Sequence, residues 1–157
     1  MELEKITRRV LSGGTMEEEI GKSDWNGFEG IVGDIFRKND FRVRNNFRFK
    51  TGRRYENDLI AARDGLAFCV DCKRWSSGRE KRWGLAKAAR EQDERTAQLA
   101  RFLRSNPVAR DMMKIPHGNL VPMVVTLHQE DLLREGRTFV VPVKKLNAFI
   151  LEFHLII

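Results

Sequence analysis

The sequence has no long apolar run. No stretch approaches the roughly 18 consecutive apolar residues that identify a membrane-spanning helix, so we expect no membrane partner. The first residues, MELEKITRRVLSGG, carry acids at Glu2 and Glu4 and lack the continuous apolar segment of a secretory signal. The same acids argue against an Arg-rich transit peptide. We therefore expect a cytoplasmic protein.

Cysteine is also scarce. The two cysteines, Cys69 and Cys72, have the C-x-x-C spacing of a zinc half-site or a redox pair. There is no second C-x-x-C, and LAFCVDCK has the pattern of a strand, on which residues three apart point to opposite faces. We therefore expect two reduced cysteines in or beside the core, with a zinc or redox protein as a minor alternative.

Negative charge is in deficit. The 157 residues include 29 Lys and Arg against 22 Asp and Glu, which gives a net charge of +7 and a pI near 9.8. Basic chains are attracted to polyanions because binding releases condensed counterions, so nucleic acid is the leading candidate partner. A merely solvated basic surface is the alternative that composition leaves open.

The first half of the chain has two clear amphipathic patterns. Apolar residues from Trp25 to Phe36 recur at helical spacing and predict a helix that ends near Asn39, with Glu29 on or beside its apolar face. An acid that reaches the rim of that face is the simpler interpretation of Glu29. The following FRVRNNFRFK alternates apolar and basic residues, which predicts a half-buried strand, or a hairpin if Asn45-Asn46 forms a turn. We expect its basic face either to be solvated or to contact phosphates through Arg42, Arg44, Arg48 and Lys50.

The segment 57–73 predicts a β-hairpin. Asp64-Gly65 between two apolar runs is typical of a two-residue turn. With Arg63 opposite Leu66, the register places Asp58 opposite Asp71, and it places Glu56 opposite Lys73. One sheet face would then gather two or three carboxylates and one ammonium, although like charges repel at this separation.

The rest of the chain completes a mixed α/β pattern. A basic loop over 74–83 offers further phosphate contacts, and its cations are Arg74, Arg79, Lys81 and Arg82. A helix is predicted over 85–105, buried strands over 119–127 and 137–143, and a closing helix over 143–153, with Pro122 and Pro142 at strand edges or boundaries. The length fits one domain, 1–157, in which 1–23 form an N-terminal helical extension.

Two opposed carboxylates need a reason to be ionised together, and a divalent cation supplies one. Mg²⁺ prefers oxygen ligands and binds through a few carboxylates plus substrate phosphates. Lys73 would then lie beside a metal-bound water or the phosphate that it attacks. The alternative is a structural network in which Lys73 neutralises Asp71 and Asp58 caps a turn.

The same residues resemble the signature of the PD-(D/E)xK nuclease superfamily. Asp58 and then Asp71-Cys72-Lys73 follow Glu29 in the right order, with Asn57-Asp58 in place of Pro-Asp. WNGFEGIVGDIF, NDLIAA and VDCKRW are most similar to the Mrr-type restriction endonucleases and the archaeal Holliday junction resolvases. The resemblance implies a restriction-endonuclease-like α/β core, in which a central mixed sheet is flanked by helices.

The resemblance also implies roles for single residues. Asp58 and Asp71 would be metal ligands, Lys73 the catalytic lysine, and Glu29 a further ligand or an orienting acid. Gln92 would match a glutamine that supports the site, with Gln98 as a competitor. We therefore expect a Mg²⁺-dependent DNA endonuclease of the restriction, repair or recombination type, with Mn²⁺ able to substitute, acting as a homodimer. The alternative is a DNA-binding module that has lost catalysis.

Overall fold

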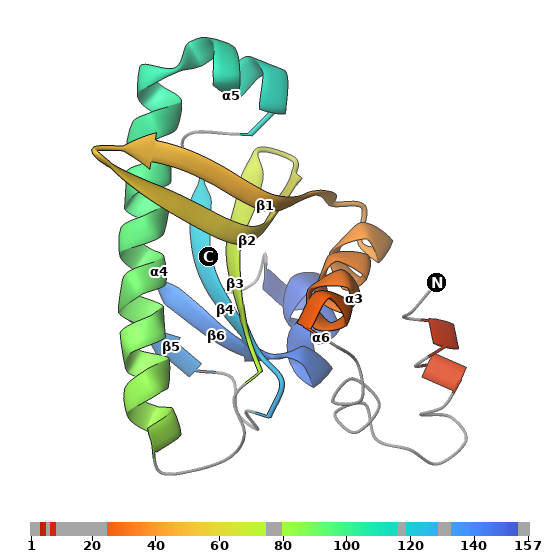
Figure 1. Ribbon diagram of the computed structural model, residues 1–157. Helices are drawn as coiled ribbons and strands as arrows, with labels where there is room; N and C mark the ends of the chain where they lie inside the picture. The colour runs from red at the N-terminus through yellow and green to blue at the C-terminus, as the bar shows by residue number, and fades with distance from the viewer. Residues whose placement is uncertain are drawn as a thin grey trace.

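The protein is built around a six-stranded mixed sheet. The computed structural model describes residues 4–5, 7–8, 25–74, 80–115, 119–128 and 133–153 (Figure 1). The strand order is β1-β2-β3-β4-β6-β5, with parallel pairing at β3–β4 and β4–β6 and antiparallel pairing elsewhere. The strands are β1 (Arg42–Thr51), β2 (Arg53–Arg63), β3 (Leu66–Lys73), β4 (Leu120–Thr126), β5 (Leu133–Glu135) and β6 (Thr138–Pro142). The expected α/β architecture is confirmed.

Helices cover both faces of this sheet. They are α3 (Trp25–Lys38), α4 (Glu80–Ser105), α5 (Pro107–Met113) and α6 (Val143–Glu152). One core cluster joins α3 and α6 to the sheet, and includes Phe28, Phe68 and Phe149. On the opposite face the long helix α4 packs through Leu99 and Leu103 (Figure 1). The first five residues of β3, Leu66 to Val70, are all apolar, as expected for a strand with both faces covered.

The turn between β2 and β3 has the predicted geometry. Asp64 and Gly65 both have positive φ, at 50° and 79°, as a two-residue hairpin turn of this kind requires. Arg63 therefore pairs with Leu66, and the register continues without a slip to Leu59 opposite Val70. The two cysteines of β3 are buried and free, and they belong to the clusters on opposite faces of the sheet.

Asn45-Asn46 does not form the turn that the sequence allowed. The strand β1 runs through it, but Asn46 has φ 51° and no pairing partner is formed at that step. Before this point Val43 packs on the α3 side, and after it Phe47 packs on the α4 side. The alternation along β1 thus changes faces at Asn46, and the predicted basic face is divided into two parts.

Other expectations need correction, lie outside the described residues or stay predictions. Pro122 lies within the central strand β4 rather than at a sheet edge, which is tolerated because the β4–β6 ladder starts only at Met123. The helix α4 starts at Glu80, so Lys81 and Arg82 belong to its first turn and not to a loop. Most of the predicted extension 1–23 and Arg79 lie outside the described residues, and the single-domain assignment stays a prediction. Among the described helices, none has the length and apolar content to cross a bilayer.

Candidate active site

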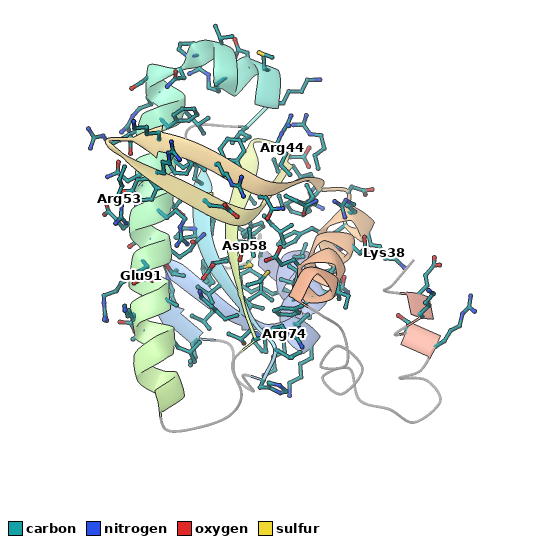
Figure 2. The ribbon with its side chains drawn as sticks, in the orientation of Figure 1. Lys38, Arg44, Arg53, Asp58, Arg74 and Glu91 are labelled. Carbon is teal, nitrogen blue, oxygen red and sulfur yellow. The ribbon has the colours of Figure 1, made fainter. Side chains whose placement is uncertain are left out.

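The hairpin β2–β3 brings Asp58 to Asp71. The paired positions end at Leu59 and Val70, and the next step of the register sets the two aspartates opposite each other. At this step a side chain replaces the backbone as hydrogen-bond acceptor: the Cys72 amide donates to Asp58 Oδ2 at 2.8 Å. Figure 2 shows Asp58 near the middle of the sheet, below the part of the β1–β2 hairpin that crosses α4.

The environment of Asp58 disfavours its charge. Burial raises the pKa of this carboxyl to about 7, and repulsion from Asp71 and Glu29 acts in the same direction, as does a hydrogen bond with Asp71. The Cys72 amide opposes the rise because it favours the carboxylate. Glu29 on α3 is buried, with 9% of its surface exposed, so the interpretation in which this acid reaches a solvated rim is wrong. Three acids from α3, β2 and β3 therefore share one electrostatic environment.

Asp71 lies between two cations. Lys73 Nζ is 3.2 Å from Asp71 Oδ2, and the Arg95 guanidinium is 4.0 Å from Asp71 Oδ1. Lys73 shares the face of β3 with Asp71 because the two residues are two positions apart. Arg95 was not singled out from the sequence, where it is one of several arginines on a long polar helix. The only usable signal is its position three residues after Gln92, which places both on one side of α4.

Gln92 connects α4 to the two site strands. It is fully buried, and its Nε2 donates to the Cys69 carbonyl at 2.6 Å and to Asn57 Oδ1 at 3.0 Å. Its Oε1 accepts a hydrogen bond from Arg95, which in turn faces Asp71. Gln98, the competing glutamine, lies elsewhere: it accepts from Thr51 Oγ1 at 2.6 Å and donates to Glu94. The structure therefore brings Gln92, and not Gln98, to the aspartates.

We predict that Gln92→Ala destabilises the protein by about 2 kcal/mol, because the Cys69 carbonyl and Asn57 lose a buried donor. Urea unfolding followed by circular dichroism measures the change, with the same m-value as wild type indicating an unchanged extent of unfolding. The control is Gln98→Ala, which removes a half-buried side chain and should cost less than about 1 kcal/mol. Equal costs at the two positions would contradict the bridging role of Gln92.

Other predicted contacts take different partners. The register was expected to set Glu56 opposite Lys73, but β2–β3 pairing stops earlier and Glu56 forms an ion pair of 2.7 Å with Arg48 across β1–β2. Arg42 donates to the Lys114 carbonyl at the far end of the hairpin. Arg44 and Lys50 are exposed, and Arg74 is half-buried at the end of β3. The side chains of Lys81 and Arg82 lie outside the described residues.

The donor set at Asp58 and Asp71 fits a divalent cation. Mg²⁺ keeps several waters and commonly takes only one or two protein carboxylates, together with phosphate oxygens. Asp71 is buried and Asp58 is half-buried, and a cation between the two carboxylates would relieve the repulsion that raises the pKa of Asp58. Within the described residues, no group of three or more His, Cys, Asp or Glu side chains is placed to hold a metal ion. The remaining ligands would be water and substrate.

Comparison with known proteins agrees with the sequence motif. The family model of the Mrr catalytic domain, described as a restriction endonuclease, matches residues 20–112, which include α3, the strands β1 to β3 and the whole of α4. An uncharacterised protein of Archaeoglobus fulgidus is 28% identical over 131 residues, covering 83% of this chain and 92% of that protein. The crystal structure of a protein of unknown function aligns with 78% of this chain at 19% identity and a TM-score of 0.41, and this chain covers only 52% of it.

Proposed function

The chain belongs to the Mrr-type restriction endonuclease family, and from this premise we propose that it is a metal-dependent DNA endonuclease that hydrolyses phosphodiester bonds. The family is a nuclease family that generally uses divalent metal ions. The observation that carries the proposal for this chain is the meeting of Asp58, Asp71 and Lys73 at the end of one hairpin, with Glu29 beside them. A decayed nuclease usually loses one of these groups, and all four are present.

Asp58 and Asp71 would hold the cation, and Glu29 would contact it directly or through water. Mg²⁺ is the ion we propose, with Mn²⁺ as a substitute; such an ion supplies Lewis acidity and lowers the pKa of a bound water. Asp71 is buried and Asp58 is half-buried, which restricts the orientations of both side chains. The Cys72 amide holds Asp58 through Oδ2.

Lys73 would act on the reacting phosphate. Its Nζ lies beside Asp71, and the Lys73 side chain is 29% exposed, so solvent can reach it. From this position it can donate hydrogen bonds to the attacking water and to a non-bridging phosphate oxygen, whose negative charge increases as the water oxygen bonds to phosphorus. Gln92 and Arg95 would be positioning residues, because they hold the strands and Asp71 from α4.

We predict that Glu29→Gln lowers the cleavage rate at subsaturating Mg²⁺ by about tenfold or more, since residues that orient metal ligands contribute 10- to 100-fold. The measurement is the initial rate against Mg²⁺ concentration, and the mutant curve should shift to higher concentration. The matched control is Asp34→Asn, which removes an acid of the same helix that pairs with Arg37. A mutant curve that overlays wild type would remove Glu29 from the site.

The function itself is tested by a cleavage screen. Purified protein is incubated with Mg²⁺ or Mn²⁺ and with linear duplex, flap, four-way junction and methylated DNA. Metal-dependent cleavage of any of these supports the proposal. Binding without cleavage of all of them would favour the second candidate, a DNA-binding module on a nuclease scaffold.

We also propose that the protein acts as a homodimer, because two sites are needed to reach two strands in one binding event. Light scattering coupled to size exclusion measures the mass in solution with and without DNA. A monomer in both conditions would remove this part of the proposal.

A further inference from the structure

The distal half of the β1–β2 hairpin projects across α4. We define this hairpin arm as residues 47–57, and Figure 1 shows its tip extending past the long helix. Arg53 lies at this tip, whereas Arg44 lies toward the other end of the hairpin (Figure 2). The arm begins where β1 changes faces at Asn46, so its cations are separated from Arg42 and Arg44.

The arm is anchored and therefore has a defined shape. Thr51 Oγ1 donates to Gln98 Oε1 of α4 at 2.6 Å. The Phe49 ring stacks on Tyr55, with centroids 5.3 Å apart, and contacts Phe102 of α4 at 5.6 Å. Arg53 lies over the Tyr55 ring at 4.6 Å. A surface built on these contacts loses little conformational freedom on binding.

One cross-strand pair of the arm sets two positive charges opposite each other, which destabilises the hairpin. Arg48 is opposite Glu56, and the two form an ion pair of 2.7 Å. The next pair on the same face sets Lys50 opposite Arg54, two like charges in the position where repulsion is strongest. Both side chains are exposed. The neighbouring pair joins a cation to an acid, whereas this pair joins two cations.

The end of α4 adds to this charge. Lys50, Gly52, Arg101 and Asn106 line a shallow hollow of about 380 Å³ between the tip and the helix. The stretches FKTGRRY and LARFLRS, which meet here, contain no acid. We call the exposed cations of these stretches the arm surface: Lys50, Arg53, Arg54, Arg101 and Arg104.

We propose that the arm surface binds the phosphate backbone of duplex DNA away from the cut, and this inference rests on the proposed function. Asp58 is five residues along β2 from Arg53, at most about 17 Å at about 3.3 Å per residue. Duplex DNA rises about 3.4 Å per base pair, so this span corresponds to roughly five base pairs. A duplex with its scissile phosphate at Asp58 and Asp71 can therefore reach the arm.

The decisive variant is Arg54→Glu, because the proposal predicts effects of opposite sign on stability and on binding. The substitution replaces repulsion with Lys50 by attraction, so the melting temperature should stay the same or rise. Affinity for a labelled 24-base-pair duplex, measured by fluorescence anisotropy in EDTA, should fall about tenfold or more. The slope of log K against log salt should become shallower by about 0.9 for each phosphate that the variant no longer neutralises.

The control is Lys145→Glu, an equal change of charge at an exposed position of α6. It should alter affinity less and leave the salt slope near that of wild type. Arg101→Gln is a second test that leaves the hairpin intact, and it should also give a shallower slope. If Arg54→Glu melts lower than wild type, Arg101→Gln becomes the deciding variant. A wild-type slope of log K against log salt in Arg101→Gln then overturns the proposal.

The outcomes separate this inference from the proposed function, since binding in EDTA does not require cleavage. Arm variants that bind like Lys145→Glu, in a protein that cleaves DNA, overturn the arm surface alone. A wild type that binds through the arm but cleaves nothing with Mg²⁺ or Mn²⁺ overturns the endonuclease and supports the arm. No binding by wild type in low salt overturns both.

Discussion

Cleavage should fall by at least about 100-fold in each of Asp58→Ala, Asp71→Ala and Lys73→Ala, since groups that act on the developing charge contribute at least this much. The two aspartates would hold the cation, and the lysine lies 3.2 Å from one of them. Single-turnover cleavage with saturating enzyme and Mg²⁺ measures the loss of the chemical step and is not affected by product release.

DNA binding in low salt should survive these substitutions. Asp58 and Asp71 are anionic and oppose the phosphate backbone, so their removal should preserve or increase affinity in EDTA. Lys73 is one cation among many and should change affinity little. The control is Lys87→Ala, an exposed lysine of α4 that pairs with Glu91. Wild-type cleavage by any of the three site variants would remove the assigned mechanism, whereas loss of binding would show that the variant had lost its structure.

The second large effect is expected in thermal melts. Asp58→Asn should raise the melting temperature of the metal-free protein at pH 8 by up to a few degrees. The amide keeps an oxygen for the Cys72 N–H and removes the repulsion with Asp71 and Glu29. Saturating Mg²⁺ should stabilise wild type by about 2.7 kcal/mol at a hundredfold excess over its dissociation constant, if the unfolded chain does not bind it. The variant should lose most of that shift.

The pH dependence follows from the direction of the pKa shift. The folded state raises the pKa of Asp58 from 3.8 to about 7, so the folded protein binds a proton that the unfolded chain releases. The destabilisation is absent below about pH 4, grows as pH rises, and is complete above about pH 7. The advantage of Asp58→Asn should accordingly be present at pH 8 and shrink by pH 5.

Melts of wild type and Asp58→Asn at pH 5 and pH 8, with and without Mg²⁺, measure both effects. Asp93→Asn is the control, because Asp93 is an acid of α4 that pairs with Arg137 and lies outside the site. A variant that melts lower without metal and keeps the full Mg²⁺ shift would show that Asp58 is a structural cap for the Cys72 amide. The two aspartates would then not share a cation.

The sequence by itself determined the hairpin register that brings the two aspartates together, one step beyond the last formed pair of the ladder. A two-residue turn has a single register, so Asp64-Gly65 sets every cross-strand neighbour as far as the ladder extends. It also determined that Glu29 lies on or beside the apolar face of its helix, because residues four positions apart, such as Trp25 and Glu29, share one face of a helix. The family follows from these local features, since its motif is carried by one helix and one hairpin.

Only the tertiary structure decided what surrounds the aspartates. The choice of Gln92 over Gln98, and the presence of Arg95, depend on how far α4 is rotated and shifted against the sheet, and the packing of Leu99 and Leu103 sets both. The change of face at Asn46 could not be predicted from the sequence either. The apolar and polar residues of β1 alternate in the same way whether or not one residue has a positive φ. Contacts within a hairpin are fixed by short-range geometry. Contacts between α4 and the strands depend on side chains distant in the sequence, which no local pattern specifies.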